Sequence, residues 1–245
     1  MSKFLNSQRL SKLGITLLWF SIIAFIILRP LPLIRLISAW NQGQVIYTID
    51  TDQKLIALTI DDGPHADITP LILDVLKKHQ AKATFFLITN NIKKNEDVIQ
   101  RLVDEGHEIG NHMLDDNRSV YLSESEFNQQ IQEADKALKQ YQPEIAWYRP
   151  GAGLYNQRVL DSASQLGYRT VLGSIYPYDA SISEQSGGKG FIEYFIKSNS
   201  HPGGIIILHD GRIRTVHVLD EVIPYLKADG YTFVTLSDLE NLEDK

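Results

Sequence analysis

Two adjacent carboxylates, Asp61 and Asp62, are the first residues in this chain whose types and spacing suggest chemistry. They directly follow the apolar run LIALTI, and Gly63 and Pro64 after them force a turn. The pair is therefore predicted to lie at the end of a strand. Neighbouring acids repel each other, so one of them usually needs a cation. A capped surface turn is the competing interpretation, because Asp, Gly and Pro also cluster in ordinary loops.

A histidine and two further acids form a second candidate group. Asn111 and His112 end the segment HEIGNH, and Asp115 and Asp116 follow. If a helical turn comes after the strand, His112 and Asp116 lie on one face and can chelate one metal ion together with Asp62. The chain contains no cysteine, so any metal must be held by His, Asp or Glu. An ordinary hydrogen-bonded histidine is the alternative interpretation.

Two more predicted strand ends carry polar residues. Tyr148 runs into the Gly-rich turn RPGAG, where backbone N–H groups suit a developing oxyanion and Arg149 can pair with a carboxylate. His209 lies near the end of the strongly apolar run GGIIILHD, and its imidazole is a candidate general acid. The structural alternative for Arg149 is a surface residue in a tight turn, and the alternative for His209 is an ordinary core histidine.

The elements that must position these residues alternate along the chain from about Lys54 onward. Short β-branched runs predict strands, and apolar residues at helical spacing predict helices, one of which has Ser123 and Glu126 placed as a capping box. The predicted strands cover residues 55–60, 83–88, 107–112, 144–148, 169–173, 203–210 and 231–236, and the predicted helices cover residues 69–79, 96–105, 123–141, 156–166, 190–198 and 220–229. Strands that alternate with helices pair in parallel. About seven such units predict an α/β fold of the distorted (β/α)7 barrel type, whose functional groups lie at the carboxyl ends of the strands.

The first 37 residues predict a membrane anchor. Leu13 to Leu28 is an uncharged apolar run that three positive charges precede and Arg29 closes. It is slightly short for a transmembrane helix across about 30 Å of hydrocarbon, but the apolar residues 30–37 can extend it. The flanking charges favour an inside N-terminus, so we expect a single-pass protein of the cell membrane with its main domain on the extracytoplasmic side. Residues 38–53 are then a connector; a cleaved signal peptide and an apolar core helix are the alternatives.

Composition narrows the class of function. The 245 residues are 43% hydrophobic and 22% charged, which is ordinary for one globular domain. The formal charge is −6, and the Lys and Arg residues are scattered without a basic stripe. We therefore expect no nucleic-acid partner.

The order of these groups resembles the polysaccharide deacetylases, the nodulation-protein-B homology domain of carbohydrate esterase family four. TIDDGP resembles the family's TFDDGP motif, GHEIGNHMLDD its second motif, YRPGAG its third and IILHD its fifth, and IYPYDA is similar to the fourth. Residues 54–240 would then be a polysaccharide deacetylase catalytic domain. The resemblance implies a metal-dependent hydrolase that removes acetyl groups from an N-acetylated, or O-acetylated, polysaccharide or oligosaccharide of the envelope or the extracellular space.

The resemblance also implies a role for each matching catalytic position. Asp61 would be the general base, and Arg149 would orient Asp61 and offset its charge. His209 would protonate the departing amine, with Asp179 holding its imidazole in the required tautomer. The backbone N–H near Ala152 would help to bind the oxyanion.

By the same resemblance, Asp62 and His112 would bind one divalent metal ion, with Asp116 as the third ligand. Asp116 stands where the family has a second histidine. Zn²⁺ is the first expectation, but an added oxygen ligand favours Mn²⁺, Co²⁺ or Ni²⁺ as well. Ala180 replaces the family's tryptophan and Gly151 its second proline, so the walls of the substrate groove are expected to be looser.

Two alternatives stay open at this point. One is a catalytically inactive glycan-binding domain of the same fold, which binds metal poorly through Asp116. The other is an amidase of the same fold that acts on a small molecule. Which polysaccharide is used, and whether the bond is an amide or an ester, is also open.

Overall fold

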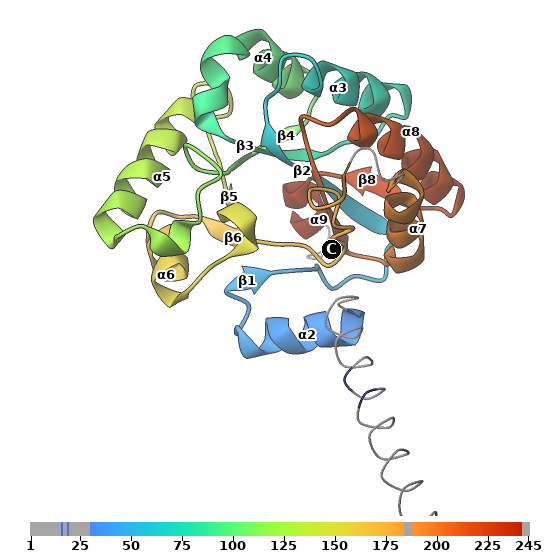
Figure 1. The fold of residues 1–245 in the computed structure, drawn as a ribbon, viewed down its shortest axis with the longest axis horizontal. Helices are drawn as coiled ribbons and strands as arrows, with labels where there is room; N and C mark the ends of the chain where they lie inside the picture. The colour runs from blue at the N-terminus through green and yellow to red at the C-terminus, as the bar shows by residue number, and fades with distance from the viewer. Residues whose placement is uncertain (1–15, 17–18, 20–29, 184–187, 242–245) are drawn as a thin grey trace, which may run out of the picture.

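One parallel sheet organises the chain (Figure 1). The computed structural model describes residues 16, 19, 30–183 and 188–241. Within them, eight strands join one sheet, and every pairing between these strands is parallel. The strands are β1 (Val45–Ile46), β2 (Leu55–Gly63), β3 (Thr84–Leu87), β4 (Glu108–Asn111), β5 (Trp147–Tyr148), β6 (Arg169–Val171), β7 (Gly204–His209) and β8 (Thr232–Val234). The predicted parallel α/β architecture is confirmed.

The strand β2 lies at the centre of the pairing pattern. On one side it pairs with β8 at its first residues and with β3 at its last, and on the other side it pairs with β7. The order along the sheet is β1-β6-β5-β4-β3-β2-β7. The chain after β1 and β6 then bridges to β7, at Thr48–Gly204 and Ile175–Ile206. These bridges close the sheet into the distorted barrel that the sequence predicts.

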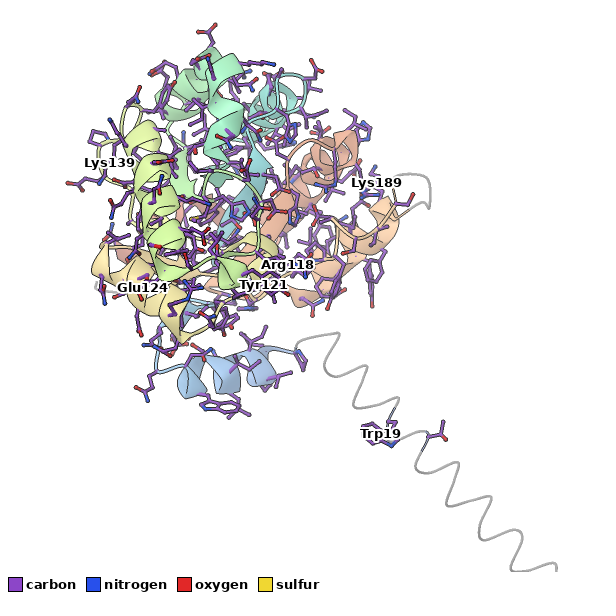
Figure 2. All side chains as sticks on the ribbon, turned by 60° about the vertical axis from the view of Figure 1, so that its left-hand side comes forward. Trp19, Arg118, Tyr121, Glu124, Lys139 and Lys189 are labelled. Carbon is purple, nitrogen blue, oxygen red and sulfur yellow. The ribbon has the colours of Figure 1, made fainter. Side chains whose placement is uncertain are left out.

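Helices surround the sheet (Figure 1). The α-helices are α2 (Leu31–Trp40), α3 (Thr69–Lys78), α4 (Glu96–Asp104), α5 (Glu124–Leu138), α6 (Gln157–Gln165), α7 (Lys189–Asn199), α8 (Ile213–Ala228) and α9 (Leu236–Asn241), and the short 3-10 helices are η1 (Thr89–Lys94), η2 (Ser119–Tyr121) and η3 (Gly151–Gly153). The predicted capping box is present, because Ser123 and Glu126 each accept a hydrogen bond from the other's backbone N–H. Figure 2 shows α5 along one side of the molecule, with Glu124 and Lys139 at its two ends.

The core consists of apolar strand residues and the inner faces of the helices. Ile56, Ile60, Phe85 and Ile109 on the strands have no exposed surface. Parallel strands are covered on both faces, which is why they appear in the sequence as continuous apolar runs such as LIALTI. This packing gives the polar residues at the strand ends a rigid support.

The predicted membrane anchor is contradicted. In the part of the chain that the structure describes, no helix has the length and apolar character needed to cross a bilayer. Most of the run Leu13 to Leu28 lies outside the described residues. The segment expected to extend it instead begins a separate helix, α2, after Pro30, and Ile34 of this helix packs against Val45 and Leu172 of the main domain. The predictions of a transmembrane helix, a membrane partner and a single-pass location in the cell membrane are therefore wrong.

Some element boundaries also differ from prediction. The strand β1 lies in the segment expected to be a connector, yet it pairs with β6. The helix α8 begins seven residues earlier than expected, at Ile213, and α9 was not predicted. Polar residues at the start of α8 interrupt its apolar periodicity, although they are buried in the structure. Arg214 donates to the carbonyl groups of residues 179, 182 and 183, and Thr215 donates to the carbonyl group of His209 at the end of β7. Local sequence patterns do not carry such tertiary contacts.

Candidate active site

The end of β2 presents Asp61 and Asp62 in two different environments. Asp62 has a φ of 72°, and the register between β2 and β3 shifts between Asp61 and Gly63. Successive side chains of a regular strand point to opposite faces, and this irregularity changes that direction. Asp61 is 4% exposed and contacts Arg149, whereas the partly exposed Asp62 lies beside His112.

A buried ion pair holds Asp61. Arg149 Nη1 donates to Asp61 Oδ1 at 2.6 Å and to Thr59 Oγ1 at 2.8 Å, and its other nitrogens donate to the carbonyl groups of residues 171 and 172. Arg149 is 1% exposed. Burial lowers the pKa of Arg149 and the charge of Asp61 raises it, but a guanidinium stays protonated in proteins. The pair therefore fixes the position of the Asp61 carboxylate.

The three predicted metal ligands lie together. His112 Nε2 is 3.5 Å from Asp62 Oδ1 and 3.8 Å from Asp116 Oδ1. One ligand atom from each residue lies within 4.8 Å of the others. The predicted helical turn after His112 does not form, however. The chain turns instead through Met113 at a φ of 68°, and this loop brings Asp116 back beside the histidine.

The orientation of the His112 ring favours a cation at this place. His112 Nδ1 lies 2.8 Å from the carbonyl oxygen of Arg149, which only accepts, so Nδ1 carries the hydrogen. Nε2 then faces two carboxylates. Burial lowers the pKa of His112, but the bond to Asp62 and the charges of Asp61 and Asp62 raise it, and the net direction is upward. The site therefore favours a positive charge, and one imidazole with two carboxylates is a suitable donor set for a divalent first-row metal.

The turn after β5 positions Asp116. The backbone N–H of Ala152, which the resemblance linked to an oxyanion, donates to the Asp116 carboxylate in this structure. A Cβ on Gly151 would lie 2.6 Å from the carbonyl oxygen of Asn117 and 2.9 Å from Asp116 Oδ1. The glycine at position 151 was expected to loosen the wall of the substrate groove. In the structure, the loop of Asp116 and Asn117 occupies the space beside Gly151.

The other candidate acid is a histidine paired with a buried aspartate. Asp179 is 2% exposed, and its two carboxylate oxygens accept from the backbone N–H and from Nδ1 of His209, each at 2.9 Å. Burial lowers the pKa of His209, but the bond to Asp179 and the negative charges of Asp179, Asp61 and Asp62 raise it to about 9. The imidazole is therefore protonated at neutral pH. Asp61 and His209 are register partners on β2 and β7, so the two candidate proton carriers lie on adjacent strands.

Two residues at the site were not predicted. Asp210 is 1% exposed, accepts a hydrogen bond from the hydroxyl of Thr69, and donates its backbone N–H to the carbonyl of Asp61 at 2.8 Å. Tyr176 lies edge-on to His209, with ring centroids 6.2 Å apart. The position of Asp210 at a strand end, directly after His209, was a signal that could have found it.

Comparisons with known proteins agree with this arrangement. The family model described as polysaccharide deacetylase matches residues 48–171. A peptidoglycan-N-acetylglucosamine deacetylase of Bacillus cereus is 35% identical over 200 residues, which cover 80% of this chain and 93% of that protein. The peptidoglycan-N-acetylmuramic acid deacetylase PdaA of Bacillus subtilis is 34% identical over 207 residues, which cover 84% of this chain and 78% of that protein.

Solved structures give the same assignment. The Bc1960 peptidoglycan N-acetylglucosamine deacetylase superposes with a TM-score of 0.76 at 31% identity, covering 83% of this chain and 96% of that one. BA3943, a CE4 family pseudoenzyme from Bacillus anthracis, superposes with a TM-score of 0.73 at 27% identity, covering 80% of this chain and 68% of that one. The chain described here belongs to the polysaccharide deacetylase family, as its motifs predict.

Proposed function

We propose that this protein is a metal-dependent hydrolase that removes acetyl groups from the N-acetylated glycan strands of peptidoglycan. One observation carries the proposal: a buried carboxylate–arginine pair and a histidine–aspartate pair, whose Asp61 and His209 lie on adjacent strands, flank a cluster of three proposed metal-ligand residues. The names of the relatives support the substrate class, because several of them are peptidoglycan deacetylases.

In the proposed reaction, Asp61 takes the proton of the attacking water. Arg149 keeps the Asp61 carboxylate in place, and because both side chains are buried, bulk water does not compete for this contact. His209 enters the reaction protonated and gives its Nε2 proton to the nitrogen that leaves the acetyl carbon. Asp179 accepts the Nδ1 hydrogen of His209, so Nε2 is the nitrogen directed to the substrate.

Asp62, His112 and Asp116 would hold the metal ion. When bound, a divalent cation supplies polarisation of the acetamide carbonyl and acidification of a water molecule. Nδ1–H of His112 donates to the carbonyl of Arg149, so the residue that holds Asp61 also orients a proposed metal ligand. The geometry of the base and of the ligand cluster is thus linked through Arg149.

The test is acetate release by the purified chain. Peptidoglycan strands and N-acetylglucosamine oligomers would be assayed with Zn²⁺, Mn²⁺, Co²⁺ or Ni²⁺ added to chelator-treated protein, beside Asp61→Asn. We expect metal-dependent release that the substitution lowers by about 10² to 10⁴, the usual contribution of a general base. Acetylated xylan belongs in the panel, because one relative is named a bifunctional xylanase/deacetylase.

The alternative of an inactive glycan-binding domain predicts a different result. A pseudoenzyme with this fold exists among the structural relatives. Bound metal without acetate release from any amide or ester substrate would favour that alternative. Absence of metal binding by the wild-type chain would refute the proposed mechanism itself.

A further inference from the structure

A short segment at the end of β3 contacts both loops that carry the ligand residues. This segment, Thr89 to Asn91, forms the first turn of η1 and is here called the η1 brace. We propose that Asn91 of the η1 brace is a positioning residue that holds Asp62 at the spacing a cation needs from His112 and Asp116. The inference rests on the metal site of the proposed function and adds a residue to it.

The first part of the η1 brace fixes the loop after His112. The backbone N–H groups of Thr89 and Asn90 donate to the carbonyl groups of Met113 and Leu114, at 3.0 and 3.2 Å. The side chain of Asn90 also donates to Asp115 Oδ1 at 2.9 Å. The loop that returns Asp116 to the site is therefore tied to η1 by backbone contacts that survive any side-chain substitution in the brace.

Asn91 makes the connection to the other loop. Its Nδ2 donates to the carbonyl oxygen of Asp62 at 3.2 Å. Asp62 has a φ of 72°, a left-handed conformation that most residues with a side chain rarely adopt, and contacts with its surroundings help to hold it there. The neighbouring backbone bond, from the Ile88 N–H to the Gly63 carbonyl at 2.8 Å, holds the strand end but not the Asp62 peptide group.

The backbone of Asn91, which carries this donor, is itself held on both sides. Its N–H donates to the carbonyl of Ile88 at 3.0 Å, and its carbonyl accepts from Asn95 Nδ2 at 2.7 Å. Ile92, the next residue, is 8% exposed and packs in the core. A donor on such a fixed support can set the direction of Asp62, and so the distance of its carboxylate from His112.

The experiment measures Zn²⁺ affinity of the full chain by competition with a chromophoric chelator. Asn91→Ala removes the amide, and Asn91→Leu removes it while nearly keeping the volume. The matched control is Asn199→Ala, because Asn199 Nδ2 also donates to a backbone carbonyl, that of Phe195 at 2.8 Å, and it is likewise partly buried but lies at the end of α7. We expect both Asn91 variants to bind Zn²⁺ about tenfold more weakly than wild type, the scale typical of residues that orient a metal ligand.

A second readout separates positioning from general stability. The melting temperatures of the metal-free Asn91 variants and the metal-free control are expected to fall by similar small amounts, and the activity of Asn91→Ala is expected to recover when excess metal is added. Equal Zn²⁺ affinity in wild type, both Asn91 variants and the control would overturn the inference while leaving the proposed function standing. A wild-type chain that binds no Zn²⁺, Mn²⁺, Co²⁺ or Ni²⁺ would overturn both.

Discussion

The pairing of His209 with Asp179 makes a quantitative prediction about pH. The pKa of His209 rises from 6.5 to about 9, mainly through Asp179, and this difference of about 2.5 corresponds to about 3 kcal/mol between the two protonation states. In Asp179→Asn the charge is lost while burial remains, so the His209 pKa should return to about 6.5 or below. At pH 8 an imidazole with a pKa of 9 is about nine-tenths protonated, and one with a pKa of 6.5 is about 3% protonated. The fraction of enzyme in which His209 can donate a proton therefore falls about 30-fold.

The assay is the pH dependence of acetate release by wild type and Asp179→Asn, with the metal saturating. Wild-type activity should fall only above about pH 9, whereas the basic limb of the variant should move down by about 2.5 pH units, the difference between these two pKa values. Asparagine offers one oxygen where Asp179 accepts two bonds, so the His209 ring is held less firmly and the rate falls for this reason as well. This loss is the same at every pH. Loss of activity along the same basic limb in both proteins would refute the assignment of this limb to His209.

The same pairing affects stability with a definite sign. The folded-state pKa of His209 is raised, so the stabilising contribution is complete below its unfolded value near 6.5 and disappears as the pH rises through about 9. Urea unfolding of wild type between pH 6 and 9.5 should show this loss. Asp179→Asn should lack it.

Three further substitutions test the rest of the site. Asp116→Ala removes a proposed ligand and should weaken Zn²⁺ binding by at least about tenfold in a chelator competition, since even residues that only orient ligands contribute that much. Gly151→Ala places a Cβ against the Asn117 carbonyl, so it should lower the free energy of unfolding in urea by about 1–3 kcal/mol and weaken metal binding. Gly190→Ala is the control and should change neither quantity, because the Cβ it adds meets no neighbouring atom within 4 Å. Arg149→Met leaves a buried carboxylate unpaired and should lower the free energy of unfolding by about 3–5 kcal/mol, and unchanged urea stability would contradict the burial of that pair.

The strand-end residues could be predicted because their signals are local. Asp61 and Asp62 follow a continuous apolar run, and a turn follows them, so their position at a strand end needs no knowledge of tertiary structure. The parallel order of strands then brings the ends together on one side of the barrel. This is why Asp62 and His112, fifty residues apart, meet as expected.

The remaining features depend on contacts that no local pattern contains. Asp116 reaches His112 through a loop with Met113 at positive φ, although spacing alone suggested a helical turn. Asn91 is one polar residue among several between a predicted strand and a predicted helix, and its proposed role depends on a carbonyl group 29 residues away. The apolar residues 30–37 were interpreted as the extension of a membrane span, but in the structure they begin α2, and Ile34 of this helix packs on the domain.

The closure of the barrel predicts where the molecule opens most readily. Strands β2 and β7 share a ladder of six register pairs. The chain after β6 is joined to β7 at a short seam, Ile175, whose N–H and carbonyl bond to residues 205 and 207. Opening this seam breaks the two backbone hydrogen bonds of Ile175, whereas β2 and β7 are joined along six register pairs, so the amide protons of the seam should exchange with solvent before those of β2 and β7. Tyr176 and Asp179 lie just beyond the seam, whereas Asp61 lies on the ladder and Asp62 directly follows it on β2. Local opening at the seam would therefore move Tyr176 relative to His209, while the base and the ligand on β2 stay in place.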